Sequence, residues 1–490
     1  MSSLGRKAVS GVLWNTGLNV FRDFLQFGLM LVLVRLLAPE VYGQFGLVTS
    51  IMGFLSVFSF RVFLEHTLQI RPGAEADYQM HFTAGAVLQF LAFLGTNLAA
   101  AVLKHFEKYA PVAPVVHVMS LLFLLDLGSE LRVKMLEREM NWKRLRILQG
   151  IGVVANAVLS LIMAVAGAGV FALLVPTLFA LVPANVDLFF IQRWRPTWKW
   201  QRAAFEPARH YGLTRMMSAV LLWSRNLSES TVLVQMVGFS LYGIYGRAVG
   251  LAAICCLKVP SLLIQALFPV LTKFHPGSDS SSKATTLVLC SVAWTTFPVA
   301  VIVSALAYPV IHTLYGARWL EAIPFLPLAM AAGVATALAQ TGSILLVANL
   351  QQKWSLYIDA VILAGIAASL LLLAPRGLKL YLAGTAAVYS GAFLLMLVRM
   401  YQKQLVDIRG IGDSLVLPAA CVAAGFLVLQ LVRARLNIST TTVGGAIFCG
   451  ALFGPVYLLL LRLTSGRQCR EVVSFLPGRA YLQRWLLLET

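Results

Sequence analysis

The stretch that decides the fold runs from Ala284 to Leu314 and reads ATTLVLCSVAWTTFPVAVIVSALAYPVIHTL, without a single Asp, Glu, Lys or Arg. It exceeds the roughly 20 apolar residues that a helix needs to cross a bilayer. Similar blocks fill most of the 490 residues, of which 59% are apolar and 12% charged. Soluble domains carry about a quarter charged residues. The composition therefore excludes a soluble enzyme, a nucleic-acid-binding protein and a disordered chain, and it predicts an all-α polytopic membrane protein.

Charges and Pro/Gly breaks divide the chain into about fourteen candidate transmembrane helices. Their predicted ranges are 11–36, 41–70, 81–104, 111–136, 145–166, 170–193, 205–230, 239–269, 284–314, 321–349, 353–374, 378–403, 412–436 and 441–464. With a cytoplasmic N-terminus, 25 of the 39 basic residues fall in inner segments and 8 in outer ones. This bias follows the positive-inside rule, so both termini are predicted in the cytoplasm. The net charge of +19 is then explained by membrane orientation and does not indicate a nucleic-acid partner.

The sequence also contains an internal repeat. The segment Tyr42-Gly43-Gln44-Phe45-Gly46 is echoed by Tyr242-Gly243-Ile244-Tyr245-Gly246, the pair Pro111 and Pro114 by Pro324 and Pro327, and Trp142 by Trp354. Repeats of this kind are common in transporters. We therefore expect two pseudo-twofold-related six-helix lobes around a central cavity. The predicted parts are an N-terminal lobe (1–200), a C-terminal lobe (201–405), helices 13 and 14 (406–466) and a cytoplasmic amphipathic tail (467–490).

Charged residues inside the predicted helices mark the candidate site. Each costs roughly 2.5–3.5 kcal/mol at a helix centre, so each needs a reason. The deep basic residues are Arg22, Arg61, Arg215, Arg225, Arg247 and Lys258, all on helices 1, 2, 7 and 8. Asn15, Asn19 and Arg22 share one helical face, and a regular α-helix would also align Arg247 with Lys258. These residues predict a tall cationic cavity for an anionic headgroup, because Arg suits phosphate oxygens.

The acidic residues leave two interpretations open. Asp23, Glu65, Asp126 and Glu229 are candidates for ion coupling. Alternatively, Glu65 neutralises Arg61, and Asp126 and Glu130 pair with Arg132 or Lys134. Asp187 is expected near a cytoplasmic helix end, at the interface. The six cysteines and the histidines lack metal-ligand spacing, so neither a metal nor a cofactor is expected.

Six short motifs lie in order within residues 8–350. They are Ser10-Gly11-x-x-Trp14-Asn15, Val34-Arg35-Leu36-Leu37-Ala38-Pro39-Glu40-x-Tyr42-Gly43, Arg138-Glu139-Met140-Asn141-Trp142, Gly238-x-x-Leu241-Tyr242-Gly243-x-Tyr245-x-Arg247-Ala248, Phe268-Pro269-Val270-Leu271 and Tyr315-Gly316-x-x-Trp319-x-x-Ala322-x-Pro324. Together they resemble the motifs of Wzx-type oligosaccharide flippases, the polysaccharide biosynthesis exporters of the multidrug/oligosaccharidyl-lipid/polysaccharide exporter superfamily. One departure is Glu229, nine residues before Gly238, where relatives often have Asp.

The resemblance implies a non-enzymatic flippase of the bacterial cytoplasmic (inner) membrane. It would move a polyprenyl-pyrophosphate-linked oligosaccharide, by alternating access, for exopolysaccharide, capsule or O-antigen synthesis. Membrane lipids, the polysaccharide polymerase and the chain-length or export machinery are the implied partners. A cation-coupled multidrug-type exporter, a membrane-embedded glycosyltransferase or polymerase, and a flippase of the peptidoglycan precursor are the alternatives. The positive balance disfavours an exporter of cationic drugs, and the short loops disfavour a polymerase.

Overall fold

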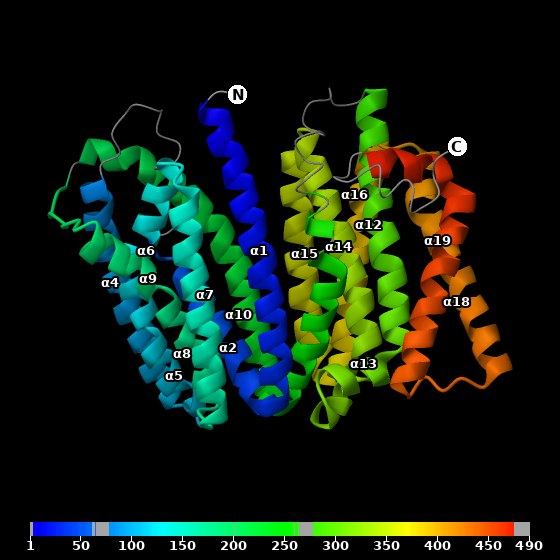
Figure 1. Ribbon diagram of the computed structural model, residues 1–490, viewed down its shortest axis with the longest axis horizontal. Helices are drawn as coiled ribbons and strands as arrows, with labels where there is room; N and C mark the ends of the chain where they lie inside the picture. The colour runs from blue at the N-terminus through cyan, green and yellow to red at the C-terminus, as the bar shows by residue number, and fades with distance from the viewer. Residues whose placement is uncertain are drawn as a thin grey trace. The chain divides into compact units, whose positions relative to one another are not determined.

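The computed structural model describes residues 3–60, 64, 78–200, 202–258, 260–262, 264 and 278–474, which form helices and no strand (Figure 1). Twelve helical stretches within these ranges are long and apolar enough to cross a membrane. Many of their large apolar side chains face outward, for example Phe24 at 81% exposure and Leu371 at 70%. Such contiguous apolar surface is typical of helices that contact lipid. The predicted all-α membrane class is confirmed.

Two features explain why twelve spans are found where about fourteen are predicted. The predicted helix 41–70 is described only in part, with α2 covering Pro39–Ser56. The predicted helices 205–230 and 239–269 join into α10 (Arg202–Ala253), in which Gly238 alone has a non-helical conformation, with φ 77° and ψ 173°. The second half of α10 counts toward one long span. The break predicted between these two helices therefore falls at Gly238.

Contacts divide the chain into two compact units, Met1–Gly243 and Ile244–Thr490. The first unit thus includes most of α10, beyond the lobe boundary predicted at residue 200. Besides α2 and α10, its helices are α1 (Ser3–Leu36), α4 (Tyr78–Lys104), η2 (Ala110–Val112), α5 (Ala113–Met119), α6 (Leu121–Arg138), α7 (Trp142–Val165), α8 (Phe171–Ala180), α9 (Val182–Val186) and the π-helix η3 (Asp187–Ile191). One apolar core of this unit joins α2, α4, α5, α8 and α10.

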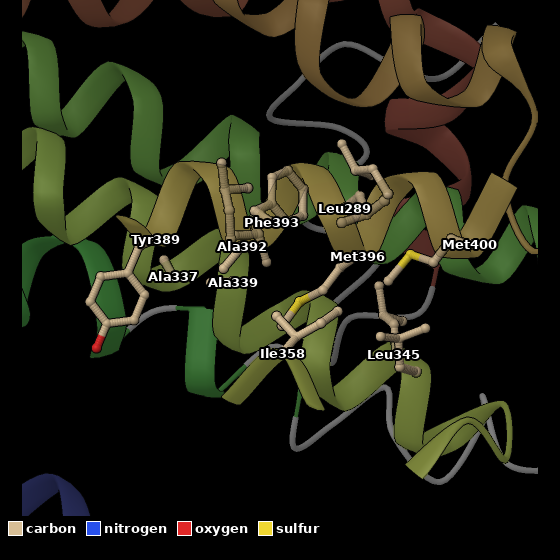
Figure 2. Close-up of a cluster of buried hydrophobic side chains, with 14 of the residues drawn as sticks. Leu289, Ala337, Ala339, Leu345, Ile358, Tyr389, Ala392, Phe393, Met396 and Met400 are labelled. Carbon is tan, nitrogen blue, oxygen red and sulfur yellow. The ribbon is translucent and has the colours of Figure 1, made fainter. Parts of the chain in front are cut away.

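The second unit starts with the end of α10 and the π-helix η4 (Ile254–Lys258). Its other helices are α12 (Asp279–Ala305), α13 (Ala307–Leu314), η5 (Ala317–Ala322), α14 (Leu326–Ala348), α15 (Gln352–Leu372), η6 (Ala374–Arg376), α16 (Leu378–Gln402), α17 (Ile408–Ile411), η7 (Gly412–Val416), α18 (Leu417–Leu436) and α19 (Val443–Ser474). Figure 2 shows an apolar core of this unit, where Ile358 lies beside Met396. Helices α18 and α19 pack on α12, and the Tyr457 hydroxyl donates to the Trp294 carbonyl oxygen at 3.2 Å.

The backbone conformations carry the same internal repeat as the sequence. Three positions with positive φ in the first unit recur about 210 residues later in the second. These pairs are Met140 and Leu350 (φ 53° and 60°), Gly167 and Gly377 (76° and 125°), and Arg193 and Gln404 (55° and 56°). Such values are uncommon for residues other than Gly. Their recurrence at the same helix ends shows that α6–η3 and α14–α16 follow a similar chain path.

The repeated Tyr-Gly motifs meet at a reciprocal crossing of α2 and α10. A Cβ atom on Gly43 would lie 1.9 Å from the Phe239 carbonyl oxygen, and one on Gly243 would lie 1.9 Å from the Pro39 carbonyl oxygen. Residues 39 and 43 therefore contact 239 and 243 in mirrored pairs, as across a twofold axis. Only Gly allows backbones to approach this closely, which is how small residues promote helix packing in membranes.

We predict that Gly43→Leu lowers the free energy of unfolding by about 3 kcal/mol or more, because the side chain would overlap the α10 backbone. Thermal unfolding of the detergent-purified protein measures this effect. Gly95→Ala is the matched control, since Gly95 lies in α4 with open space where the new methyl would go. Its effect should stay within about 1 kcal/mol. A Gly43→Leu variant as stable as the control would contradict the crossing.

Candidate functional site

A tight turn between α6 and α7 places three basic residues at the start of α7. Met140 takes the left-handed conformation that ends α6, with φ 53°. Asn141 then caps α7, its side-chain oxygen accepting from the Arg144 backbone N–H at 3.4 Å. Asn is a preferred N-cap because it satisfies one of the free N–H groups of the first turn. The cap fixes where α7 begins, and so the directions in which the side chains of Lys143, Arg144 and Arg146 project from it.

The opposite wall comes from an irregular helix. Pro183 begins α9 after a break at Leu181, and α9 passes directly into the π-helix η3, which begins at Asp187. π-Turns hold one extra residue per turn and are frequent at functional sites. Gly152 lets the α7 backbone reach α8, because a Cβ there would lie 2.4 Å from the Ala180 carbonyl oxygen. Helix α7 thus packs against α1, α6, α8 and α9, and α6 packs against α9 (Figure 1).

Asp187 sits at the centre of a buried ion-pair cluster. Its side chain is 1% exposed, and its Oδ2 accepts from Arg132 Nε at 2.6 Å. Its Oδ1 accepts from Arg144 Nε at 2.9 Å and Nη2 at 2.6 Å. Asp187 begins the last turn of the span Phe171–Ile191, near a helix end as expected. Tertiary packing adds two guanidinium groups that compensate the buried carboxylate. Arg132 contacts Asp187, and Lys134 contacts Glu137 at 2.9 Å, partners that the sequence analysis did not assign.

A pocket of about 270 Å³ opens beside this cluster, within the first unit. Its walls come from α1, α6, α7, α8 and α9. The polar side chains that line it are Arg22, Ser129, Glu130, Arg132, Arg146 and Gln149. Three arginines against one glutamate give the lining a positive charge. The pocket therefore suits an anion.

Arg146 is the best-defined cation of this pocket. It is half-buried, its Nη1 donates to Gln149 Oε1 at 2.5 Å, and its Cζ lies 5.9 Å from the centre of the Trp142 ring. The positive charges of Arg146 and Arg22 repel each other. Both charges persist because guanidinium groups stay protonated in proteins. An anion between them would relieve this repulsion.

The structure brings only one of the predicted site residues into this pocket. Arg22 lines it, and Asp23 lies 3.6 Å from Arg22 in a partly exposed pair. Asn19 is half-buried on the same helix but does not line the pocket. Arg61 and Glu65 lie outside the described residues, as do the side chains of Asn15 and Arg215.

The other predicted residues of the first unit lie elsewhere on it. Arg225 and Glu229 are half-buried on α10, where Arg225 Nη2 lies 3.4 Å from Asn226 Oδ1 and the Glu229 charge acts on Tyr242. Asp126 is buried in α6, at 8% exposure. The structure does not assemble these three residues with Arg22 into one described pocket, so their predicted roles stay predictions.

The predicted residues of the second unit differ in their surroundings. Arg247 is half-buried and lies near Tyr315. Burial raises the pKa of the Tyr315 hydroxyl to about 12, against an opposing effect of Arg247, so Tyr315 stays neutral near pH 7. Lys258 is exposed at the end of the π-helix η4. Because a π-helix takes more residues per turn, the alignment of Lys258 with Arg247 predicted for a regular α-helix does not hold.

Two lining residues, Arg132 and Arg146, were missed as site candidates. The sequence analysis considers Arg132 only as a partner of an acidic residue and does not single out Arg146. Their sequence positions look the same whether the side chains face water or each other, so no pattern in the sequence distinguishes them.

Comparisons with known proteins give the family of the chain. A sequence profile described as "Polysaccharide biosynthesis protein" matches residues 32–324, more than half of the chain. The succinoglycan biosynthesis transport protein ExoT of Rhizobium meliloti is 25% identical over 66% of this chain. The match spans 66% of ExoT, slightly under two thirds of the length of that protein. The lipopolysaccharide biosynthesis protein WzxC of Escherichia coli is 20% identical over 84% of this chain and 83% of that protein.

Solved structures agree on the fold. The lipid II flippase MurJ, in an inward closed conformation, superposes with a TM-score of 0.70 at 12% identity, over 92% of this chain and 98% of that one. An inward-facing multidrug resistance MATE transporter of the MOP superfamily gives 0.59 at 14% identity, over 78% and 95% of the two chains. At this identity the likeness shows the fold alone.

We predict that Asp187→Asn destabilises the protein by about 3–5 kcal/mol, because it leaves the buried Arg132 and the partly exposed Arg144 without their common carboxylate. The control is Asp23→Asn, which breaks the longer and more exposed pair with Arg22 and should change stability little. Thermal unfolding in detergent compares the two variants. Equal unfolding temperatures would show that the cluster contributes no more than the exposed pair.

Proposed function

Because the chain belongs to the polysaccharide biosynthesis protein family, matched over residues 32–324, we propose that it is a flippase for a polyprenyl-pyrophosphate-linked oligosaccharide. It would take this lipid from the cytoplasmic to the outer leaflet of the bacterial inner membrane, with both termini in the cytoplasm. The fold of the MOP-superfamily transporters supports a transporter. The names of the relatives ExoT and WzxC support a polysaccharide pathway.

The observation that carries the proposal is the excess of arginine within the membrane-spanning helices. Moving a bare pyrophosphate through hydrocarbon is prohibitive, since an isolated buried ion costs tens of kcal/mol in a Born estimate. In our proposal Arg22, Arg225 and Arg247 contact the pyrophosphate, together with Arg61, Arg215, Lys258, Asn15 and Asn19. Arg22, Arg225 and Arg247 lie in membrane-spanning helices. Arg suits this role because its planar fork matches phosphate oxygens.

Ion coupling is a second part of the proposal. The candidates are Asp23, Glu65, Asp126 and Glu229. Asp126 is buried and Glu229 is half-buried, which favours a role in which a proton or cation binds and leaves. Alternating access would couple such binding to the exposure of the pyrophosphate site.

A cation-coupled small-molecule exporter is the competing function, since multidrug transporters share the fold. Such a protein binds cations and would need an acidic cavity. The pocket described in the first unit has three arginines and one glutamate, which favours an anionic cargo. A polymerase is less well supported, because the relatives are named for transport and biosynthesis and share this transporter fold.

We predict that Arg225→Ala or Arg247→Ala abolishes polymer export while membrane levels stay normal, because each removes a charge that the pyrophosphate needs. Surface polymer and protein abundance are measured in the same cells. Arg435→Ala is the control, since Arg435 is exposed at the end of α18. Normal export in both Arg225→Ala and Arg247→Ala cells would refute their assignment to the pyrophosphate.

The transport step itself is tested in a deletion strain. Radiolabelled lipid-linked oligosaccharide should accumulate on the cytoplasmic leaflet while surface polymer disappears. If single units reach the outer leaflet and fail only to polymerise, the protein acts as a polymerase.

A further inference from the structure

We propose that the pocket between α1, α6, α7 and α9 of the first unit binds a phosphate-class oxyanion through Arg132, Arg146 and Arg22. This site lies within a single unit. It uses two arginines that the proposed pyrophosphate residues do not include. The chemistry is shared by a free phosphate or pyrophosphate and by the pyrophosphate of a lipid. The inference stands whether or not the protein moves a lipid-linked sugar.

The first argument is an unused donor on a buried arginine. The Arg132 side chain is 3% exposed, and only its Nε contacts Asp187 in the described structure. Its Nη1 is buried with no hydrogen-bond partner among the described residues, although Arg132 lines the pocket. Buried polar groups nearly always have a partner, and an orphan in a native structure points to an unseen ligand or water.

Arg146 repeats the pattern on the facing helix. Its Nη1 is bound to Gln149, whereas its Nε is buried and has no hydrogen-bond partner in the described part of the chain. Two guanidinium groups from α6 and α7 therefore offer free donors at one pocket. Arginine forks of this kind are the usual ligands of phosphate oxygens.

The charge balance favours an anion even when nearby acids are counted. The cations are Arg22, Arg132, Lys134, Arg144 and Arg146, and the carboxylates are Asp23, Glu130, Glu137 and Asp187. Five cations against four carboxylates leave one positive charge, beside hydrocarbon-facing helices. An oxyanion would neutralise this charge and accept hydrogen bonds from the free donors. The pocket volume of about 270 Å³ leaves room for the anion and for water.

The internal repeat shows that the fold does not require these charges. At the offset of 210 residues that pairs Met140 with Leu350 and Gly167 with Gly377, the residue that matches Arg146 is Leu356, and Ile358 matches Leu148 of the pocket lining. Ile358 is 1% exposed and packs in the apolar core of α14, α15 and α16 (Figure 2). The stretch of α14 that corresponds to the region around Arg132, residues 339–346, carries no charge. Since apolar residues fill an equivalent junction, and buried ion pairs are weak sources of stability, a ligand explains the arginines of the first unit.

The test uses the full-length protein in detergent at low chloride concentration. Binding of inorganic pyrophosphate and phosphate is measured by calorimetry and by the shift of the unfolding temperature. Arg146→Gln and Arg22→Gln are compared with wild type. The control is Arg399→Gln: Arg399 is also half-buried, lies 4.4 Å from the Trp354 ring centre and donates to Gln351, but belongs to the second unit.

We expect wild type and Arg399→Gln to bind pyrophosphate alike, and Arg146→Gln to bind about tenfold more weakly or worse, because a charge-assisted contact is lost. Without ligand, Arg146→Gln removes both an attraction to Glu137 and a repulsion by Arg22, so its unfolding temperature should stay close to that of wild type. A purely structural Arg146 would lower that temperature. Absence of pyrophosphate binding in wild type, or equal affinity in Arg146→Gln, would overturn the proposal.

Competition identifies the source of the anion. If polyprenyl pyrophosphate in mixed micelles displaces inorganic pyrophosphate, the site binds the lipid-linked group. If inorganic pyrophosphate stays bound, the site takes a soluble phosphate.

The outcomes also separate this proposal from the proposed flippase function. Normal pyrophosphate binding by Arg146→Gln, with export lost in Arg225→Ala, refutes only the pocket. Weak binding by Arg146→Gln, with no accumulation of lipid-linked sugar in the deletion strain, refutes only the flippase.

Discussion

The contact on which the first unit depends is the crossing of α2 and α10 at Gly43 and Gly243. Lipid tails are as apolar as the helices, so burying apolar surface adds little to helix association inside a membrane. Close van der Waals packing has to replace it, and here two glycines bring backbone against backbone. The crossing places the opening segment of the second repeat on that of the first. Because the crossing holds α10 against α2, residues of α10 also join the core formed by α2, α4, α5 and α8.

The two units use one chain path for different purposes. In the second unit, α14, α15 and α16 enclose a core of Leu, Ile, Phe and Met side chains. In the first unit, the corresponding helices enclose Arg132, Asp187 and a pocket with further arginines. A buried carboxylate held by two guanidinium groups is tolerated only because every charge has a partner or a solvated opening. This asymmetry distinguishes an apolar helix junction in the second unit from a charged one in the first.

A membrane transporter of an anionic lipid has to solve an electrostatic problem, because hydrocarbon does not solvate phosphate. Arginines on membrane-spanning helices can neutralise the phosphate charge there by direct contact. Membership of the polysaccharide biosynthesis family fits this reasoning, and so does the transporter fold shared with a lipid II flippase. The charge on the protein and the charge on the proposed cargo are opposite.

The sequence by itself determined the membrane class, the helical segments and the repeat, because these depend on local properties: apolar length, breaks at Pro and Gly, and motifs at fixed offsets. It also located the break at Gly238 and singled out Arg22. Only the tertiary structure decided which charges meet. Asp187 and Arg132 are 55 residues apart, so no spacing rule joins them, and their burial follows from the packing of α6 against α9 and η3. The same holds for Arg146, which lines a pocket that exists only once α1, α6 and α7 have packed together.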